Sequence, residues 1–316
     1  MAEQVFLSIC IPAYKRADYL KRLLDSILIQ SFRDFEVIVT DDSPDGSVET
    51  LCLEYKEKYP IQYFRNIKPL GAPENWNEGI RRAAGQWIKL MHDDDWFGDE
   101  HSLNCFLDEI RANPSASFIF CAYRNIHLET GGKKEIFAPK WRRRMLERNP
   151  VTLFSKNIIG PPSAVLHRRN SNVSYDVHLK WLVDIDFYVQ FLANSKSRYC
   201  SRVLVNIGVG EQQVTRASFR NRPIEIPENF YLLNKVGVEN LSNILVYDAW
   251  WRLIRNLGIR KSEDIAASGY NSAIPLIILS MINFQAKLPV SLLRIGLASK
   301  VCMSICYVIH INKIKS

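Results

Sequence analysis

The chain has 316 residues, 47% of them hydrophobic, which is enough apolar material for the core of one large α/β domain or of one domain with an appendage. This composition excludes an intrinsically disordered chain. The 41 basic and 33 acidic residues give a formal charge of +8 and imply an anionic partner. Nucleic acid is not expected to be that partner, because the basic runs lack interleaved aromatic residues and zinc-finger spacing.

The cysteines and the N-terminus favour a cytoplasmic protein. The seven cysteines are scattered and have no CxxC or His/Cys metal spacing, so we expect reduced, buried thiols. The first apolar run is short, lacks a basic leader and is soon followed by Pro12, so we expect no signal peptide.

The first ninety residues alternate between short apolar runs and amphipathic segments. The apolar runs predict strands at residues 6–11, 35–39, 61–64 and 87–91. The amphipathic segments predict helices at residues 19–29, 48–59 and 74–84. This order is typical of a parallel sheet with helices on both faces, in which ligands bind beyond the carboxyl ends of the strands.

Polar residues follow three of these strands and are expected to share one rim of the sheet. They are Pro12, Tyr14 and Arg16 after the first strand, Asp41 and Asp42 after the second, and His92, Asp93, Asp94 and Asp95 after the fourth. Three adjacent carboxylates repel one another, so the last group is either a solvated turn or a cation site. No glycine-rich phosphate loop follows the first strand, which disfavours a dinucleotide fold and a P-loop.

The rest of the chain is patterned less regularly. We expect helices at residues 102–111 and 183–193, strands at 116–123, 164–166 and 201–209, and C-terminal helices at 228–236, 241–257, 262–284 and 290–311. The basic run of Lys140, Arg142, Arg143 and Arg144 is either a solvated face or an anion-binding surface.

Two apolar runs in the C-terminal region, residues 274–282 and 301–309, are shorter than the roughly 18 to 20 residues that span a bilayer. One interpretation is a helix in the membrane interface, anchored by Arg294, Lys300, Lys313 and Lys315. The other is packing on the catalytic domain or on a second subunit, which would make a homo-oligomer.

Three segments together resemble the family 2 glycosyltransferases, which have a GT-A fold. They are SICIPAYKRADYLKRLLDSILIQSFRDFEVIVTDDSPDGS at residues 8–47, GAPENWNEGIRRAAGQWIKLMHDDDWF at 71–97 and WLVDIDFYVQFL at 181–192. The resemblance implies a Rossmann-like, mostly parallel central sheet with a C-terminal helical extension. It also implies a nucleotide-sugar half at residues 1–98, an acceptor half at 99–220 and a helical region at 221–316.

In this family a Mg²⁺ or Mn²⁺ ion bound by an Asp-x-Asp-Asp run neutralises the diphosphate leaving group. The resemblance places Asp94 as the main metal ligand, with Asp95 beside it, and Asp93 at the nucleotide sugar. In a register shifted by one residue, Asp93 and Asp95 would be the ligand pair. His92 stands where the family has its first Asp, and its imidazole is suited to a ribose or phosphate oxygen. A plain turn or helix cap is the alternative role for the run.

The resemblance also assigns the nucleotide pocket. It places Pro12 and Tyr14 on its wall, Arg16 at a phosphate, Asn77 facing it, and Asp42 as the acceptor for the N3–H of a uracil-type base. Asp41 is either a second such group or a cap of the following turn.

The general base implied by the resemblance is Asp184, in the segment 183-VDIDFY-188, with Asp186 as a cap or an assisting group. A simple helix cap is the alternative role for Asp184. The segment from Gly210 to Arg216 resembles a loop that closes over the diphosphate in relatives.

These features predict a metal-dependent, inverting transferase. It moves one sugar from a UDP-sugar to a hydroxyl of a glycan or lipid-linked glycan, in surface polysaccharide synthesis at the inner face of an anionic membrane. A catalytically degenerate assembly scaffold and a metal-dependent phosphoester or diphosphate hydrolase are the alternatives.

Overall fold

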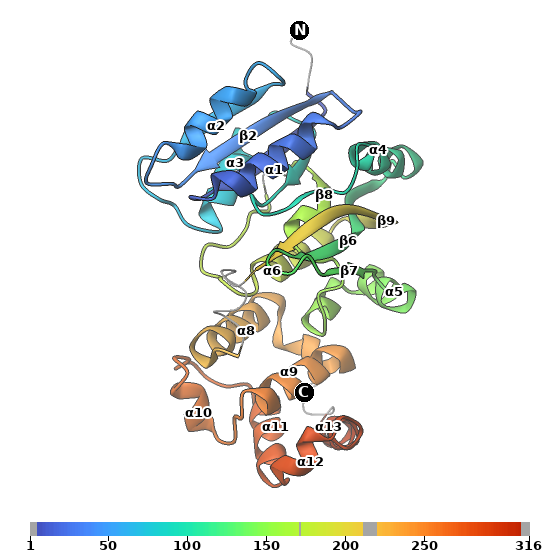
Figure 1. Ribbon diagram of the computed structural model, residues 1–316. Coiled ribbons are helices and arrows are strands. Elements are labelled where there is room, and N and C mark those ends of the chain that lie inside the picture. The colour runs from blue at the N-terminus through green and yellow to red at the C-terminus, as the bar shows by residue number, and fades with distance from the viewer. Residues whose placement is uncertain (1–4, 171, 211–219, 311–316) are drawn as a thin grey trace. The chain divides into compact units, whose positions relative to one another are not determined.

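The computed structural model describes residues 5–170, 172–210 and 220–310 (Figure 1). The chain divides into two compact units. The first comprises Met1–Arg148, Ile158–His178 and Asp186–Gln212, and the second comprises Asn149–Asn157, Leu179–Ile185 and Gln213–Ser316. The functional division at residues 98 and 220 stays a prediction.

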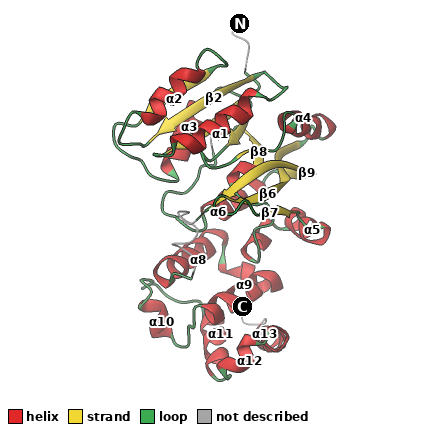
Figure 2. Ribbon diagram, in the orientation of Figure 1, coloured by secondary structure: helices red, strands yellow, loops and turns green. Residues whose placement is uncertain are grey.

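A single sheet forms the centre of the first unit and has nine strands within the described ranges (Figure 2). Its strands, in spatial order, are β3 (Ile61–Arg65), β2 (Phe35–Asp41), β1 (Leu7–Ala13), β4 (Trp87–Leu90), β8 (Val165–Arg168), β6 (Ala116–His127), β9 (Lys196–Val209) and β5 (Trp96–Phe97), with β7 (Lys133–Ile136) paired to β6.

The sheet is mixed, with a parallel half built from the first ninety residues. β1 runs parallel to β2 and β4, and β2 runs parallel to β3. β8, β7 and β5 run antiparallel to their neighbours, whereas the two long strands β6 and β9 are parallel. The predicted α/β class with a mostly parallel central sheet is confirmed.

The register of the parallel strands aligns their carboxyl ends. Ala13 of β1 lies opposite Asp41 of β2, and Cys10 lies opposite Leu90 of β4. The residues that follow β1, β2 and β4 therefore share one rim of the sheet, as the strand order predicted.

The helices of the first unit flank this sheet. They are α1 (Ala17–Leu28), α2 (Ser47–Tyr55), α3 (Glu74–Arg82), α4 (Ser102–Ala112), α5 (Lys140–Arg148) and most of α6 (Val183–Leu192), with a 3-10 turn at Pro162–Ala164.

Alternation along β1 explains why helices cover both faces of the parallel strands. Leu7, Ile9 and Ile11 join the buried core that includes the leucines of α1 and the apolar face of α2 (Figure 1). Cys10 points to the other face, where its Sγ lies 3.5 Å from the carbonyl of Gly79 in α3. The fully buried β1 is thus typical of a central parallel strand.

The second unit is helical in its described residues, as predicted for the C-terminal segment. Its helices are α8 (Arg222–Val236), α9 (Ile244–Asn256), α10 (Ser262–Ala266), α11 (Leu276–Ala286), α12 (Val290–Arg294) and α13 (Gly296–His310), with 3-10 turns at Pro150–Phe154 and Val238–Ser242.

The prediction of two continuous helices at residues 262–284 and 290–311 is wrong. Gly269 takes a left-handed backbone conformation (φ 91°) after α10, and Pro275 directly precedes α11. An extended Ile295 separates α12 from α13. None of the helices in the described ranges has the length and hydropathy that crossing a bilayer requires.

Candidate active site

The acidic run forms a tight, buried turn between β4 and β5. The N–H of Asp95 donates to the carbonyl of His92 at 3.1 Å and closes the turn. Arg22 of α1 holds it from outside, because Nη2 donates to the carbonyl of Asp94 at 3.0 Å and the guanidinium lies 3.7 Å from the ring centroid of Trp96. The run is a turn, but the three carboxylates are not solvated.

Gly208 of β9 lets this turn approach the sheet. A Cβ atom at this position would collide with the carbonyl oxygen of Asp94, so only glycine fits. The N–H of Gly208 donates to Oδ1 of Asp95 at 3.1 Å. One glycine therefore both admits the acidic run and holds one of its carboxylates.

The three aspartates are between 2% and 7% exposed, and Arg16 is the cation that pairs with two of them. Arg16 Nη2 lies 2.7 Å from Oδ1 of Asp93, and Nη1 lies 3.5 Å from Oδ2 of Asp94. The N–H of Tyr14 also donates to Oδ2 of Asp93 at 3.4 Å. The rim residues after β1 thus reach the acidic run directly.

The nearby cations do not offset the burial of these carboxylates. Burial raises the pKa of Asp93 to about 7 despite the attraction of Arg16, and the neighbouring Asp94 raises it further. Burial, and next the charge of Asp94, raise the pKa of Asp95 well above its usual range. A cation bound at this turn would favour the ionised forms of these groups.

His92, Asp94 and Asp95 form a donor set that fits a divalent cation. One donor atom from each side chain lies within 4.8 Å of the others, and Nδ1 of His92 is 3.9 Å from Oδ2 of Asp95. Nε2 of His92 is buried and has no hydrogen-bond partner within the described residues. Burial lowers the pKa of the imidazole, which keeps it neutral and able to donate a lone pair. One nitrogen and two carboxylates suit Mn²⁺ and, with less preference, Mg²⁺.

The structure thus groups both predicted metal ligands, Asp94 and Asp95, while Asp93 faces Arg16. Metal binding by these residues stays a prediction. His92, predicted to contact the sugar nucleotide, is also placed as a donor to a metal. Its position at the first Asp of the family motif was the sequence signal for that role.

Asp42, the predicted acceptor for the base, is buried at the end of β2. Its Oδ1 accepts from Asn66 Nδ2 at 2.8 Å and from the N–H of Leu70 at 2.9 Å, and its Oδ2 accepts from the N–H of Gly71 at 2.8 Å. Asp42 therefore orders the loop that leads to α3. The neighbouring Asp41 accepts from the N–H of Ser43 at 2.8 Å, the turn cap considered from the sequence.

The other predicted pocket residues lie on the same rim or on α3. Pro12 is buried in β1, and Tyr14 is half exposed. Asn77 of α3 is buried and pairs with the backbone of Tyr175. The Asn77 side-chain amide donates to the Tyr175 carbonyl at 2.8 Å and accepts from the Tyr175 N–H at 2.9 Å. Trp76 stacks near the imidazole of His92, with 4.7 Å between ring centroids. Contacts of these residues with a nucleotide stay predictions.

Asp184 lies in the first turn of α6, among residues of the second unit. Its Oδ2 accepts from Nδ2 of Asn157 at 3.4 Å, and burial raises its pKa to about 6. The three backbone N–H groups before α6, those of residues 180–182, instead donate to the buried Glu228 carboxylate at 2.8 to 3.0 Å. Glu228 thus orders the segment that leads into α6.

Glu228 is a positioning residue that sequence reasoning missed. It lies in α8, and nothing near it in the sequence signals its link to the segment before α6. The loop from Gly210 to Arg216, predicted to close over the diphosphate, lies almost wholly outside the described residues, because residues 211–219 are not described.

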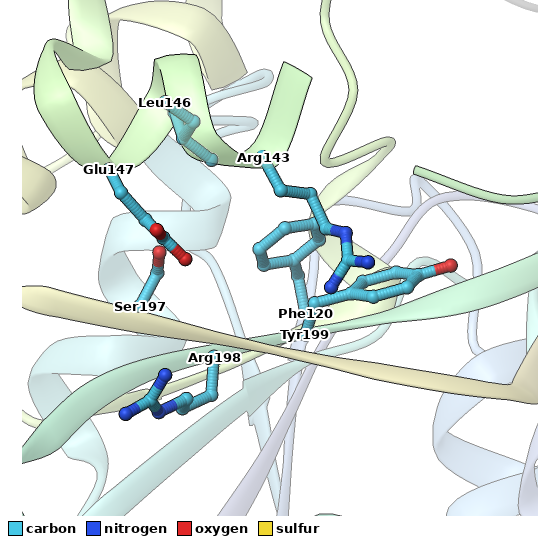
Figure 3. Close-up of a pocket in the computed structure, with 7 residues that line it drawn as sticks. All are labelled: Phe120, Arg143, Leu146, Glu147, Ser197, Arg198 and Tyr199. Atoms are coloured by element: carbon cyan, nitrogen blue, oxygen red, sulfur yellow. The ribbon is translucent and has the colours of Figure 1, made fainter. Parts of the chain in front are cut away.

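A separate shallow pocket lies between α5 and the strands β6 and β9 (Figure 3). Its polar lining includes Arg143 from the predicted basic run, together with Arg198 and Glu147. The Arg143 guanidinium stacks over the ring of Tyr199 at 4.6 Å. None of its lining residues follows β1, β2 or β4, so this pocket is separate from the acidic turn.

Comparison with known proteins adds an independent observation. The family model described as "Glycosyl transferase family 2" matches residues 8–173. An uncharacterized glycosyltransferase of Haemophilus influenzae is 36% identical over 114 residues, covering 36% of this chain and 37% of the relative. An uncharacterized glycosyltransferase of Rickettsia typhi is 27% identical over 222 residues, covering 67% of this chain and 66% of the relative.

Two solved structures share the fold. S. aureus TarS 1-349 in complex with UDP-GlcNAc has a TM-score of 0.63 at 16% identity, covering 95% of this chain and 88% of that one. A mannosyltransferase from Pyrobaculum calidifontis in complex with GDP-Man and Mn²⁺ has a TM-score of 0.56 at 12% identity, covering 100% and 89%. These similarities confirm the GT-A type of α/β fold. The chain spans only 37% to 66% of the length of the curated relatives named above.

Proposed function

Because the chain belongs to glycosyl transferase family 2, we propose that it transfers one sugar from a UDP-sugar to a hydroxyl of a glycan or lipid-linked glycan, with inversion at the anomeric carbon. The observation that carries this proposal is the buried acidic turn at the rim, where Arg16 forms ion pairs with two of the three aspartates. Such an arrangement is costly for folding alone and is suited to a cation shared with a diphosphate.

In this proposal His92, Asp94 and Asp95 hold a Mg²⁺ or Mn²⁺ ion. The bound ion would supply positive charge to the diphosphate as the bond to the sugar breaks. Arg16, which already lies at this turn, is within reach to contact a phosphate oxygen beside the ion. Arg22 and Gly208 keep the turn in place.

Asp184 is the proposed general base that accepts the proton of the acceptor hydroxyl. A carboxylate with a pKa of about 6 is still ionised at neutral pH and is a stronger base than an ordinary carboxylate. A direct attack by that hydroxyl on the side opposite the diphosphate inverts the anomeric centre, since no second nucleophile intervenes.

The preference for uridine rests on Asp42 at the end of β2. Its carboxylate is oriented by three donors of the following loop and retains acceptor capacity for the N3–H of a uracil ring. The fold itself accommodates both nucleotides, because one similar structure contains UDP-GlcNAc and another contains GDP-Man. A base-specific contact must therefore decide between them.

The test is calorimetric titration of the full chain with UDP, with GDP and with Mn²⁺. We expect UDP to bind in the presence of Mn²⁺, GDP to bind at least about tenfold more weakly, and Asp94→Asn to abolish the metal-dependent part. Asp108→Asn is the matched control, because Asp108 is an exposed aspartate of α4. Slow hydrolysis of a panel of UDP-sugars then identifies the sugar.

The same titration separates the alternatives. Absence of metal-dependent UDP binding would contradict the proposal and favour an assembly scaffold. A two-metal hydrolase needs further ligands, and within the described ranges His92, Asp94 and Asp95 are the one group of three such residues.

A further inference from the structure

Helix α13 is fixed in the second unit by one face. Ser299, Met303 and Cys306 are buried. Ser299 Oγ accepts from Trp251 Nε1 of α9 at 3.0 Å, and Tyr247 of the same helix donates to Cys306 Sγ at 3.1 Å. α13 also contacts α11 and α12 (Figure 1). These contacts hold this face of α13 against its own unit, so the opposite face of the helix points away from that core.

The opposite face of α13 is apolar and exposed to solvent. Leu297, Val301, Ile305 and Val308 are between 49% and 80% exposed. Their spacing of four, four and three residues places them in one stripe along the helix. The stripe is about 16 Å long, which is too short to span a bilayer but long enough to lie along its surface. Exposed apolar stripes of this kind mark a surface that another apolar phase covers.

The sequence around the stripe is basic, and one of its cations, Lys300, pairs with Asp248 of α9 at 3.0 Å. Residues 265–316 contain five basic residues, Lys287, Arg294, Lys300, Lys313 and Lys315, and no aspartate or glutamate. Lys287 lies before α12 and Arg294 is its last residue, and both are exposed. The last acidic residue of the chain is Asp264. Lys287 and Arg294 are therefore the exposed cations that an anionic surface would neutralise.

We propose that the α13 stripe, defined as Leu297, Val301, Ile305 and Val308, docks the protein on an anionic lipid surface. The apolar side chains enter the boundary between headgroups and acyl chains, and the exposed Lys287 and Arg294 remain among the anionic headgroups. A second copy of the chain fits less well, because a homodimer through this face would place the positive rims together. This inference does not depend on the proposed glycosyl transfer.

The test is flotation of the full chain with vesicles of phosphatidylcholine containing 30% phosphatidylglycerol, beside vesicles of phosphatidylcholine alone. We expect flotation with the anionic vesicles and about tenfold less partitioning to the neutral ones or at high salt. Asp94→Asn is expected to float like the unmodified protein, so failure of catalysis and failure of docking are distinguishable.

Two variants test the apolar and the electrostatic parts of the proposed docking separately. Val301→Asn/Ile305→Asn removes apolar contact, and we expect partitioning to fall by about tenfold or more. Its control is Leu53→Asn, at an exposed leucine of α2. Lys287→Gln/Arg294→Gln removes two exposed charges without touching the core, and we expect a loss on the order of tenfold on anionic vesicles only.

Three outcomes would overturn the proposal. They are an unmodified protein that ignores anionic vesicles, a stripe variant that floats like the control, and equal binding to neutral and anionic vesicles. Light scattering of the same proteins tests the rival occupant, a second copy of the chain. If the unmodified protein is a dimer and Val301→Asn/Ile305→Asn makes it a monomer, the stripe is a dimer interface. The charge variant keeps the test valid if the apolar variant unfolds.

Discussion

The acidic turn of the first unit and the α13 stripe of the second depart from the usual pattern of a folded protein in opposite directions. The turn buries three aspartates, whereas the stripe exposes four large apolar side chains. Both arrangements cost free energy in the isolated chain, since buried charges lose hydration and exposed apolar groups gain contact with water. Both regions are therefore suited to a binding partner that offsets this cost, which is the role proposed for each.

The two regions also differ in how well the chain itself compensates that cost. At the turn, Arg16, Tyr14 and Gly208 each supply a partner to a carboxylate. At the stripe, the outward side chains have no such compensation beyond the anchored inner face of α13. If the regions serve separate tasks, changes at one leave the measured property of the other intact.

The largest expected effect is on the chemical step. Asp184→Asn removes the proposed base while keeping its shape, and we expect kcat to fall by about 10³-fold. UDP binding is expected to stay within about twofold, because Asp184 does not serve the nucleotide. Steady-state kinetics with calorimetry check this, with Asp108→Asn as control. A variant that retains more than a tenth of the activity refutes Asp184 as base. If Asp184→Asn also lost vesicle flotation, the two regions would not act independently.

The next effect is the pH dependence of turnover. Asp184 acts as a base only when it is ionised, and burial raises its pKa to about 6. Activity is therefore expected to rise about tenfold per pH unit below 6 and to level off above it. The residual activity of Asp184→Asn should lack this inflection. Rate measurements between pH 5 and 8 check the prediction, and an unchanged inflection in the variant assigns it to another group.

The parallel half of the fold was predictable because its signals are local. Buried strands and amphipathic helices alternate within about ten residues, and the strand ends place the rim residues together whatever the rest of the chain does. The resemblance then pointed to Asp94, Asp95 and Asp184. The predicted bounds of the first strand were too short at its carboxyl end, because β1 extends to Ala13 and the prediction ended at residue 11.

The supporting contacts were not predictable, because they join distant parts of the chain. Gly208 meets Asp95 across 113 residues, and Glu228 meets Leu182 across 46. The first contact depends on the order of β8, β6 and β9 in the sheet, and the second depends on helix packing. Residue periodicity encodes neither. The breaks around Gly269 and Ile295 were missed although local signals mark them, since Gly269, Pro275 and Gly296 all disfavour a continuous helix.

A smaller effect tests His92 as the nitrogen donor of the proposed metal set. An imidazole favours Mn²⁺ over Mg²⁺ more than carboxylates do. We expect His92→Asn to weaken Mn²⁺ binding in the presence of UDP by about tenfold and Mg²⁺ binding by less. Calorimetry with each ion measures the ratio. Equal losses for the two ions would place His92 at the nucleotide or at Trp76 instead.

The smallest effect is on stability and has opposite signs with and without metal. Asp94 raises the pKa of both Asp93 and Asp95 by repulsion, so its charge destabilises the metal-free fold. Asp94→Asn is expected to raise the free energy of unfolding by about 1 kcal/mol, or the melting temperature by about 2 to 4 °C, despite losing its 3.5 Å pair with Arg16. Saturating Mn²⁺ with UDP should stabilise the unmodified protein by about 2 to 3 kcal/mol and the variant hardly at all. Thermal unfolding with and without Mn²⁺ and UDP checks whether the order of stability of the two proteins reverses. A variant that is less stable than the unmodified protein without metal would show that the buried turn contributes to folding in its own right.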